Sequence, residues 1–323
     1  MLGSYSFIAA VNGNGDEPIE PIPPLLWGPL LLGGGLLNDD LNCVAMDASA
    51  IVIGGRRNGA INSIVSFDQG VTWSPTNIAT YNESFACGTN NGKWGIGAYK
   101  ALYISTSGAA GPYVSTTTFS GIIYSVNISD SGNVLATSNN KEYKLISSAG
   151  GLISSGVMSD TTNRSCYLGG DRWLMCGGDD AYYTDDNFIT FTTFDGGFGT
   201  GWDAKAITSD PLTGLVVAVF YNGKIAYSRD FGVDGTWIVS ALSVTNTWFS
   251  VGMSSGYVVA GDARGRAKYA KVDDLDMWFD LPQNLNSGNT STSPTIFGIA
   301  GDGEGIFVNV QNDGFMSISP PLA

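Results

Sequence analysis

The fold is decided by Ser66-Phe67-Asp68-Gln69-Gly70-Val71-Thr72-Trp73. Asp68 and Ser66 carry side chains that hydrogen-bond nearby backbone groups in turns, and Gly70 tolerates backbone angles that other residues resist. Two apolar runs precede this stretch, at residues 50–54 and 61–65, and both have the composition of β-strands. The stretch therefore predicts a tight turn after a strand, with the Trp73 ring folded back under the sheet.

The same residue pattern returns along the chain in weaker form. The matching residues are Thr184, Asp186 and Phe191 in one copy, Ser228, Asp230, Gly232 and Trp237 in a second, and Asp273 and Trp278 in a third. With three more eroded copies, the marks fall at positions 68, 107, 149, 186, 230, 273 and 319. Spacings of this size are typical of four-stranded propeller blades, whose repeats span about 40–50 residues.

The motif S-x-D-x-G-x-T-W resembles the Asp box, or BNR repeat, of sialidase-like propellers. The resemblance implies that each turn joins the third and fourth strands of a blade. With seven marks, we expect an all-β, seven-bladed β-propeller with four-stranded antiparallel blades over residues 24–323. The seventh repeat ends after its third strand, so residues 25–31 are expected to supply the outer strand and close the ring. Residues 1–23 are interpreted as an N-terminal arm with a Pro-rich linker.

Composition narrows the classes of function. The chain has a net charge of −14, 44 glycines and no histidine. An acidic protein is repelled by phosphate backbones and anionic membranes, so neither nucleic acid nor membrane insertion is expected. The lack of histidine removes the commonest general base and zinc ligand, and no motif for a cofactor is present. No cofactor and no metal site are predicted, and acidic pairs such as Asp179-Asp180 are interpreted as solvated turns.

The four cysteines do not form a metal-binding or redox motif. They are Cys43, Cys87, Cys166 and Cys176, all in apolar strand-like segments, and are interpreted as small buried hydrophobic residues. Cys166 and Cys176 flank one predicted hairpin turn. A disulfide between these two residues stays open at this point.

No catalytic residue is assigned. The resemblance to sialidases implies three arginines that clamp a carboxylate, the first in an Arg-Ile-Pro motif, but no arginine here is followed by Ile-Pro. Other glycosidases use two carboxylates across a pocket. Asp39, Asp40, Glu83 and Asp203 precede predicted inner strands and are the candidates for such a pair, although solvated loop carboxylates are the favoured interpretation.

A candidate binding face follows from the repeat alignment. The turns between the second and third strands of each blade share one face of a propeller, and the basic residues concentrate there. The predicted binding residues are Arg56, Arg57, Tyr99, Lys100, Lys141, Tyr221, Lys224, Arg264 and Arg266. Such a face would attract an anionic group such as an acidic glycan. The alternative is that lysine and arginine are simply common in exposed hairpin turns.

The expected function is a non-catalytic binding or assembly module. Low charge, abundant Gly, Ser, Thr and Asn, and eroded Asp boxes resemble propellers of bacteriophage virions, where they form tail, fibre or capsid-surface parts. This predicts a virion location, with a cytoplasmic or secreted protein as the alternative. It also predicts a symmetric multi-copy assembly whose other proteins bind the arm, with strand addition at residues 6–11. A glycoside hydrolase and a soluble lectin are the alternative functions.

Overall fold

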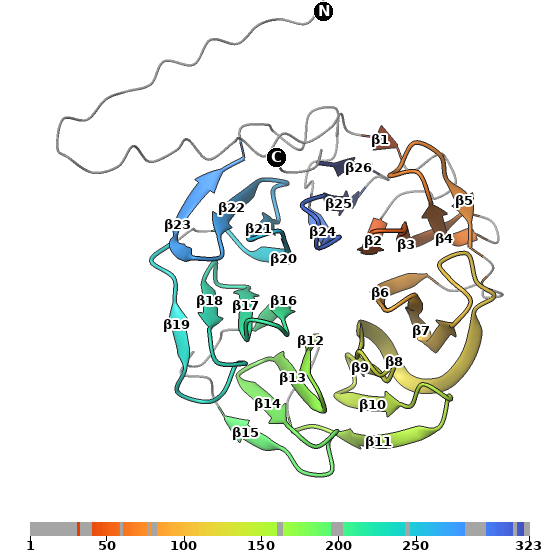
Figure 1. The fold of residues 1–323 in the computed structure, drawn as a ribbon, viewed down its shortest axis with the longest axis horizontal. Helices are drawn as coiled ribbons and strands as arrows, with labels where there is room; N and C mark the ends of the chain where they lie inside the picture. The colour runs from red at the N-terminus through yellow and green to blue at the C-terminus, as the bar shows by residue number, and fades with distance from the viewer. Residues whose placement is uncertain are drawn as a thin grey trace, which may run out of the picture.

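The antiparallel sheets form a ring (Figure 1). Their inner strands line a central channel with a cavity of about 370 Å³. The computed structural model describes residues 31–32, 41–58, 61–76, 78, 83–159, 164–194, 203–242, 246–281, 295–312 and 315–319. The predicted arm, residues 1–23, lies outside the described residues. In the described part no helix is long and apolar enough to cross a membrane.

Four of the sheets have four strands that follow one another in chain order. The first contains β2 (Leu41–Asp47), β3 (Ala50–Asn58), β4 (Ile61–Ser66) and β5 (Ser74–Pro75). The next contains β12 (Arg164–Gly169), β13 (Arg172–Gly177), β14 (Asp180–Thr184) and β15 (Thr192–Phe194). It is followed by β16 (Ala204–Asp210), β17 (Leu215–Phe220), β18 (Ile225–Ser228) and β19 (Trp237–Val239), and then by β20 (Trp248–Ser254), β21 (Tyr257–Asp262), β22 (Ala267–Lys271) and β23 (Asp274–Asp280).

The second and third repeats share a single six-stranded sheet. It contains β6 (Ser84–Asn90), β7 (Lys93–Ser105), β8 (Val114–Ile128), β9 (Val134–Ser138), β10 (Glu142–Ile146) and β11 (Leu152–Val157). The first half of β8 pairs with β7, and its second half pairs with β9. The prediction of seven separate four-stranded blades is therefore wrong, because the described strands form six hydrogen-bonded sheets. The physical reason is that β7 and β8 are 13 and 15 residues long and continue through the expected turns.

The last sheet contains β24 (Ile296–Gly301), β25 (Phe307–Gln311), β26 (Phe315–Ile318) and the two-residue strand β1 (Leu31–Leu32). In β1, Leu31 pairs with Met316 and Leu32 with Phe315. The prediction that residues 25–31 form a full closing strand is wrong, since the described pairing includes only Leu31 of that range, together with Leu32. Residues 25–30 lie outside the described residues.

The hydrophobic core lies between neighbouring sheets. One cluster joins Leu174 and Cys166 to Val216 and Phe220 of the next sheet. All six residues of β17 are buried, as expected for a strand covered on both faces. Packing between radial sheets in this way fixes the positions of the inner strands, and therefore of the side chains that line the channel.

Candidate functional site at the mouth of the channel

Seven side chains meet at one end of the central channel. They come from the beginnings of the inner strands, with the six-stranded sheet contributing both β6 and the second half of β8. The residues, called here the mouth ring, are Asn42, Phe85, Tyr124, Arg164, Lys205, Phe249 and Phe297. They are all half-buried, and together with Ala204 they line a cavity of about 380 Å³. A cavity of this size matches small-ligand sites.

β-Bulges aim six of these side chains. The pairing of each inner strand with the next strand is interrupted around Asn42, Phe85, Tyr124, Lys205, Phe249 and Phe297. A bulge inserts one unpaired residue and re-aims its side chain, and bulges are over-represented at barrel rims and beside active sites. The seventh member, Arg164, is instead the first residue of β12 and pairs regularly with Cys176. The same local feature therefore recurs in six inner strands and produces the ring.

Glycines let the inner strands approach closely enough to form this ring. A Cβ atom on Gly88 of β6 would collide with the carbonyl oxygen of Val126 in β8. A Cβ atom on Gly301 of β24 would lie 2.6 Å from the carbonyl oxygen of Met253 in β20. Both positions need the absence of a side chain, because the neighbouring backbone occupies that space.

Four aromatic side chains form one side of the mouth ring. Phe85 and Tyr124 pack edge to face, with centroids 6.0 Å apart and planes at 81°. Phe249 and Phe297 do the same at 6.1 Å and 90°. Around the closed ring Asn42 follows Phe297 and precedes Phe85, so it lies between the two aromatic pairs. Its side-chain amide donates to the carbonyl of Ser84 at 3.2 Å. These five residues, the aromatic arc, offer ring faces and an amide.

Two cations complete the mouth ring. Arg164 donates from Nε to the carbonyl of Lys205 and from Nη1 to the carbonyl of Tyr124 at 3.2 Å, and its guanidinium lies 5.5 Å from the Tyr124 ring centre. Burial lowers the pKa of Arg164 from its usual value, although a guanidinium keeps its charge in proteins. Lys205 pairs with Asp203, with 2.5 Å between Nζ and Oδ2, and lies 5.2 Å from the Tyr221 ring centre. Arg164 and Lys205 are called here the cationic arc.

The turns of the predicted basic face adjoin the mouth. The backbone N–H of Tyr99 donates to the carbonyl of Glu83, and that of Tyr221 donates to the carbonyl of Asp203. Each acceptor lies two residues before a mouth-ring residue. Tyr99 and Tyr221 are exposed, with 45% and 58% of their surface in solvent, so ring faces border the channel mouth outside the ring itself.

Several basic side chains of the predicted binding face contact a nearby carboxylate, carbonyl or aromatic ring. Arg56 pairs with Glu83 at 3.5 Å, Lys141 donates to the carbonyl of Ser159 at 2.6 Å, and the Lys100 ammonium lies 5.2 Å from the ring centre of Tyr99. The Lys224 side chain is half-buried, and the side chain of Arg57 lies outside the described residues. Several cations of this face therefore already interact with neighbouring groups of the protein, and the role of the face in binding stays a prediction.

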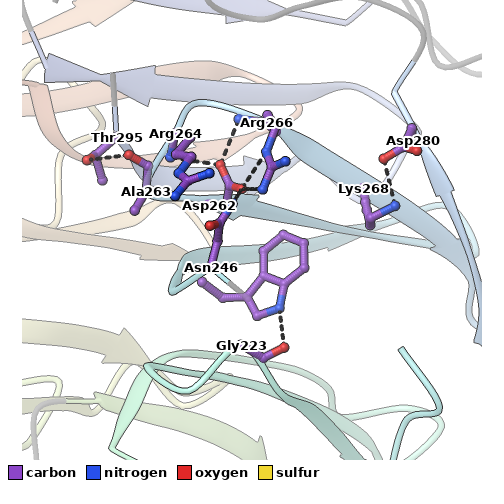
Figure 2. Close-up of polar contacts among 10 residues, drawn as sticks. Gly223, Asn246, Asp262, Ala263, Arg264, Arg266, Lys268, Asp280 and Thr295 are labelled. Carbon is purple, nitrogen blue, oxygen red and sulfur yellow. Dashed lines mark hydrogen bonds and ion pairs between the residues drawn. The ribbon is translucent and has the colours of Figure 1, made fainter. Parts of the chain in front are cut away.

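Figure 2 shows the part of that face that contains Arg264 and Arg266. Asp262 is almost fully buried and accepts the backbone N–H groups of both arginines at 2.8 Å. Its other oxygen accepts Nε and Nη2 of Arg266 at 2.9 and 2.8 Å, and the amide of Asn246 at 3.0 Å. Arg266 also borders a smaller cavity of about 230 Å³ with Trp248, Asp262, Lys268 and Asp280. Because Arg266 makes three hydrogen bonds to Asp262, it stabilises this turn.

The turn at Asp68 has the hydrogen bonds expected from its sequence. Asp68 accepts the N–H and the hydroxyl of Thr72 at 2.8 and 2.6 Å, and Ser66 accepts the N–H of Gly70 at 2.7 Å. These bonds lower the pKa of Asp68 to about 2. The Trp73 indole donates to the carbonyl of Gly70 at 3.0 Å, and its ring packs at the contact between the first and last sheets.

The copies keep different parts of this turn. Asp186 accepts the N–H and hydroxyl of Thr190, and Thr184 accepts the N–H of Phe188 at 3.0 Å. Phe191, however, is 46% exposed. In another copy Ser228 accepts the N–H of Gly232 at 3.1 Å, and Trp237 donates to the carbonyl of Gly232 at 3.0 Å.

The last of these copies keeps mainly its aromatic residue. Trp278, which lies five residues after Asp273, donates to the carbonyl of Leu275 at 2.7 Å. Together the copies place these acids in turns of the ring.

The candidate carboxylates do not gather into one pocket in the described residues. Glu83 pairs with Arg56, Asp203 pairs with Lys205, and Asp39 and Asp40 lie outside the described residues. The described part of the chain holds no group of three or more His, Cys, Asp or Glu side chains placed to bind a metal. All four cysteines are free, including Cys166 and Cys176.

Sequence reasoning missed the mouth ring, although a signal was present. The second residue of most inner strands is large or polar, while the residue after it is small. The pairs are Asn42-Cys43, Phe85-Ala86, Tyr124-Ser125, Lys205-Ala206, Phe249-Ser250 and Phe297-Gly298. Aligning the repeats on their inner strands, as well as on the Asp turns, would have found it.

Comparisons with known proteins agree with the fold. No model of a protein family matches the chain, and no curated protein matches it. Among solved structures it is similar to the crystal structure of the WD40 β-propeller domain of Doa1, with a TM-score of 0.69 and 13% identity, over 91% of this chain and 96% of that one. At this identity the likeness shows the fold alone. The chain is therefore a β-propeller.

Proposed function

We propose that this propeller is a non-catalytic binding and assembly module whose mouth ring is its recognition site. The observation that carries the proposal is the recurring bulge, which aims six side chains from six inner strands into one cavity. Rigid scaffolds that present side chains in this way suit recognition, because little conformational freedom is lost on binding.

The chemistry of the mouth ring favours an acidic glycan as ligand. Sugar rings stack on aromatic faces such as those of Phe249 and Phe297, and a carboxylate would face the cationic arc of Arg164 and Lys205. The exposed rings of Tyr99 and Tyr221 would extend the contact beyond the cavity. The predicted basic face then surrounds the site and attracts the anion.

For the biological setting we propose a bacteriophage virion component built from Asp-box repeats, located in the tail, a fibre or the capsid surface. Its support is the Asp turn at residues 66–73 with its weaker copies, and the Gly-, Ser-, Thr- and Asn-rich composition. In this setting residues 1–23 bind a neighbouring virion protein. Electron microscopy of the source particle tests this: residues 1–23 threaded into a neighbour at symmetric positions support it, and free monomers outside any particle contradict it.

Glycan binding is tested by calorimetric titration with carboxylate-bearing and neutral oligosaccharides of equal length. We expect the acidic set to bind more tightly. Phe249→Ala and Phe297→Ala should each weaken binding about tenfold or more, because each removes one aromatic stacking contact. A contact of about 1.4 kcal/mol corresponds to a tenfold change in affinity. Phe67→Ala is the matched control, because Phe67 is 60% exposed in an Asp turn, away from the mouth ring.

Two outcomes would contradict the proposal. The first is that folded wild-type protein binds no acidic oligosaccharide, or that Phe67→Ala weakens binding as much as the mouth variants do. The second is that new reducing ends appear during incubation, which would establish a glycoside hydrolase instead.

A further inference from the structure

Two thiols that the recognition site does not use lie together in the channel wall. Cys43 is in β2 of the first sheet, and Cys87 is in β6 of the six-stranded sheet. Their Sγ atoms are 2.8 Å apart and share a hydrogen bond, and both cysteines are free. The first sheet and the six-stranded sheet are therefore in contact through two reduced sulfur atoms.

The absence of a side chain at Gly54 leaves space for the two sulfur atoms. Gly54 of β3 lies opposite Cys43, and a Cβ atom there would lie 2.7 Å from the Cys43 sulfur and 3.2 Å from the Cys87 sulfur. Any side chain at position 54 would thus push the two sulfurs out of place.

The pair is also reachable. Both cysteines line the channel cavity of about 370 Å³. Cys87 is half-buried, whereas Cys43 is only 7% exposed. A small reagent in the channel therefore meets Cys87 first.

We propose that Cys43 and Cys87 form a thiol-oxidation site that reacts with low-molecular-weight disulfides and closes a cross-link between the first sheet and the six-stranded sheet. The Cys87 thiolate attacks one sulfur of the reagent, forms a mixed disulfide and releases one thiolate. The Cys43 thiolate then attacks the Cys87 sulfur and releases the second. The two protein sulfurs are oxidised, the two reagent sulfurs are reduced, and the two protein protons pass to the released thiolates.

The other two cysteines serve as an internal comparison. Cys166 pairs with Leu174 and Cys176 with Arg164 across β12 and β13, so the two cysteines are not opposite each other. Burial raises the pKa of Cys166, Cys176 and Cys43 alike. The Cys43–Cys87 pair differs in geometry, because its sulfur atoms are 2.8 Å apart and both of its cysteines line the channel cavity, whereas Cys166 and Cys176 are both buried.

The test treats the folded full-length protein with oxidised glutathione at about pH 8.5, where thiols are more ionised. Free thiols are then counted after denaturation, and the tryptic peptides are mapped by mass spectrometry. We expect two of the four thiols to disappear, and the peptide with Cys43 to be linked to the peptide with Cys87. The cross-linked protein should melt about 5 °C higher, because the link constrains the unfolded chain.

Variants separate this result from general oxidation. Cys87→Ala should abolish the link, and Cys43→Ala should leave a single glutathione adduct on Cys87. Cys166→Ala is the matched control and should still form the Cys43–Cys87 link. Four free thiols in treated wild-type protein, or a link that joins Cys166 to Cys176, would overturn the proposal. Peptide mapping of the wild type decides the matter even where a variant fails to fold.

Discussion

At the scale of single residues, the Asp turn shows how a short motif holds a sheet edge. Asp68 accepts two bonds from Thr72 and one from the Ser66 hydroxyl, while Gly70 adopts a φ of 85°. The turn also touches the neighbouring sheet, because a side chain on Gly70 would collide with Ile318. One turn thus closes its own sheet and packs against the next.

The lowered pKa of Asp68 predicts a dependence of stability on pH. Its pKa falls from 3.8 to about 2 on folding. A depressed carboxyl pKa contributes stability that is fully present above the unfolded value and is lost as the pH falls through the folded value. Melting temperatures between pH 5 and about pH 2 should therefore fall less steeply for Asp68→Asn than for the wild type. Parallel curves would show that the turn does not depend on the charge of Asp68.

Two aromatic residues at the same motif position should differ in their contribution to stability. Trp73 is half-buried against the first and last sheets and donates a hydrogen bond, whereas Phe191 is 46% exposed. We expect Trp73→Ala to lower the free energy of unfolding by about 2–4 kcal/mol, and Phe191→Ala by about 1 kcal/mol or less. Urea denaturation of both variants measures this difference. Equal losses would contradict the assigned packing of Trp73.

At the scale of strands, the inner strands combine close approach with bulges. Gly88 lies where β6 meets the second half of β8, and no side chain fits there. Gly88→Ala should therefore destabilise by about 1–3 kcal/mol through overpacking. Gly151→Ala is the control, since a Cβ atom there would meet only the Ser147 hydroxyl at 3.4 Å. Chemical denaturation that shows no difference between the two variants would contradict the closeness of β6 and β8.

The sequence allowed the strands and the Asp turns to be predicted, but it did not give the sheets. The repeat spacing located inner strands such as β2 and β20, because apolar runs and turn residues recur with a regular period. The continuous sheet of the second and third repeats was missed, because the repeat spacing predicted two separate blades there, whereas β7 and β8 run on through the expected turns. The mouth ring was missed because the repeats were aligned on their Asp turns alone, so the large-then-small residue pair shared by the inner strands went unnoticed. The bulge at this pair also interrupts the regular alternation of side chains along a strand.

At the scale of the whole molecule, the sheets pack against one another around a single channel, and the core is distributed among their contacts. From the sequence we interpret residues 1–23, which are outside the described residues, as an arm with a Pro-rich linker. We therefore expect that deleting residues 1–23 leaves cooperative thermal unfolding within a few degrees of the full chain, as followed by circular dichroism. Loss of the cooperative transition would mean that these residues belong to the folded propeller.

The central claim is that the mouth ring binds an acidic glycan, and a crystal structure of the complex tests it most directly. We predict that a carboxylate-bearing oligosaccharide lies in the cavity between Phe249 and Tyr124, with its carboxylate toward Arg164 and Lys205. A sugar bound elsewhere on the ring, with the cavity unchanged from the free protein, would contradict the account.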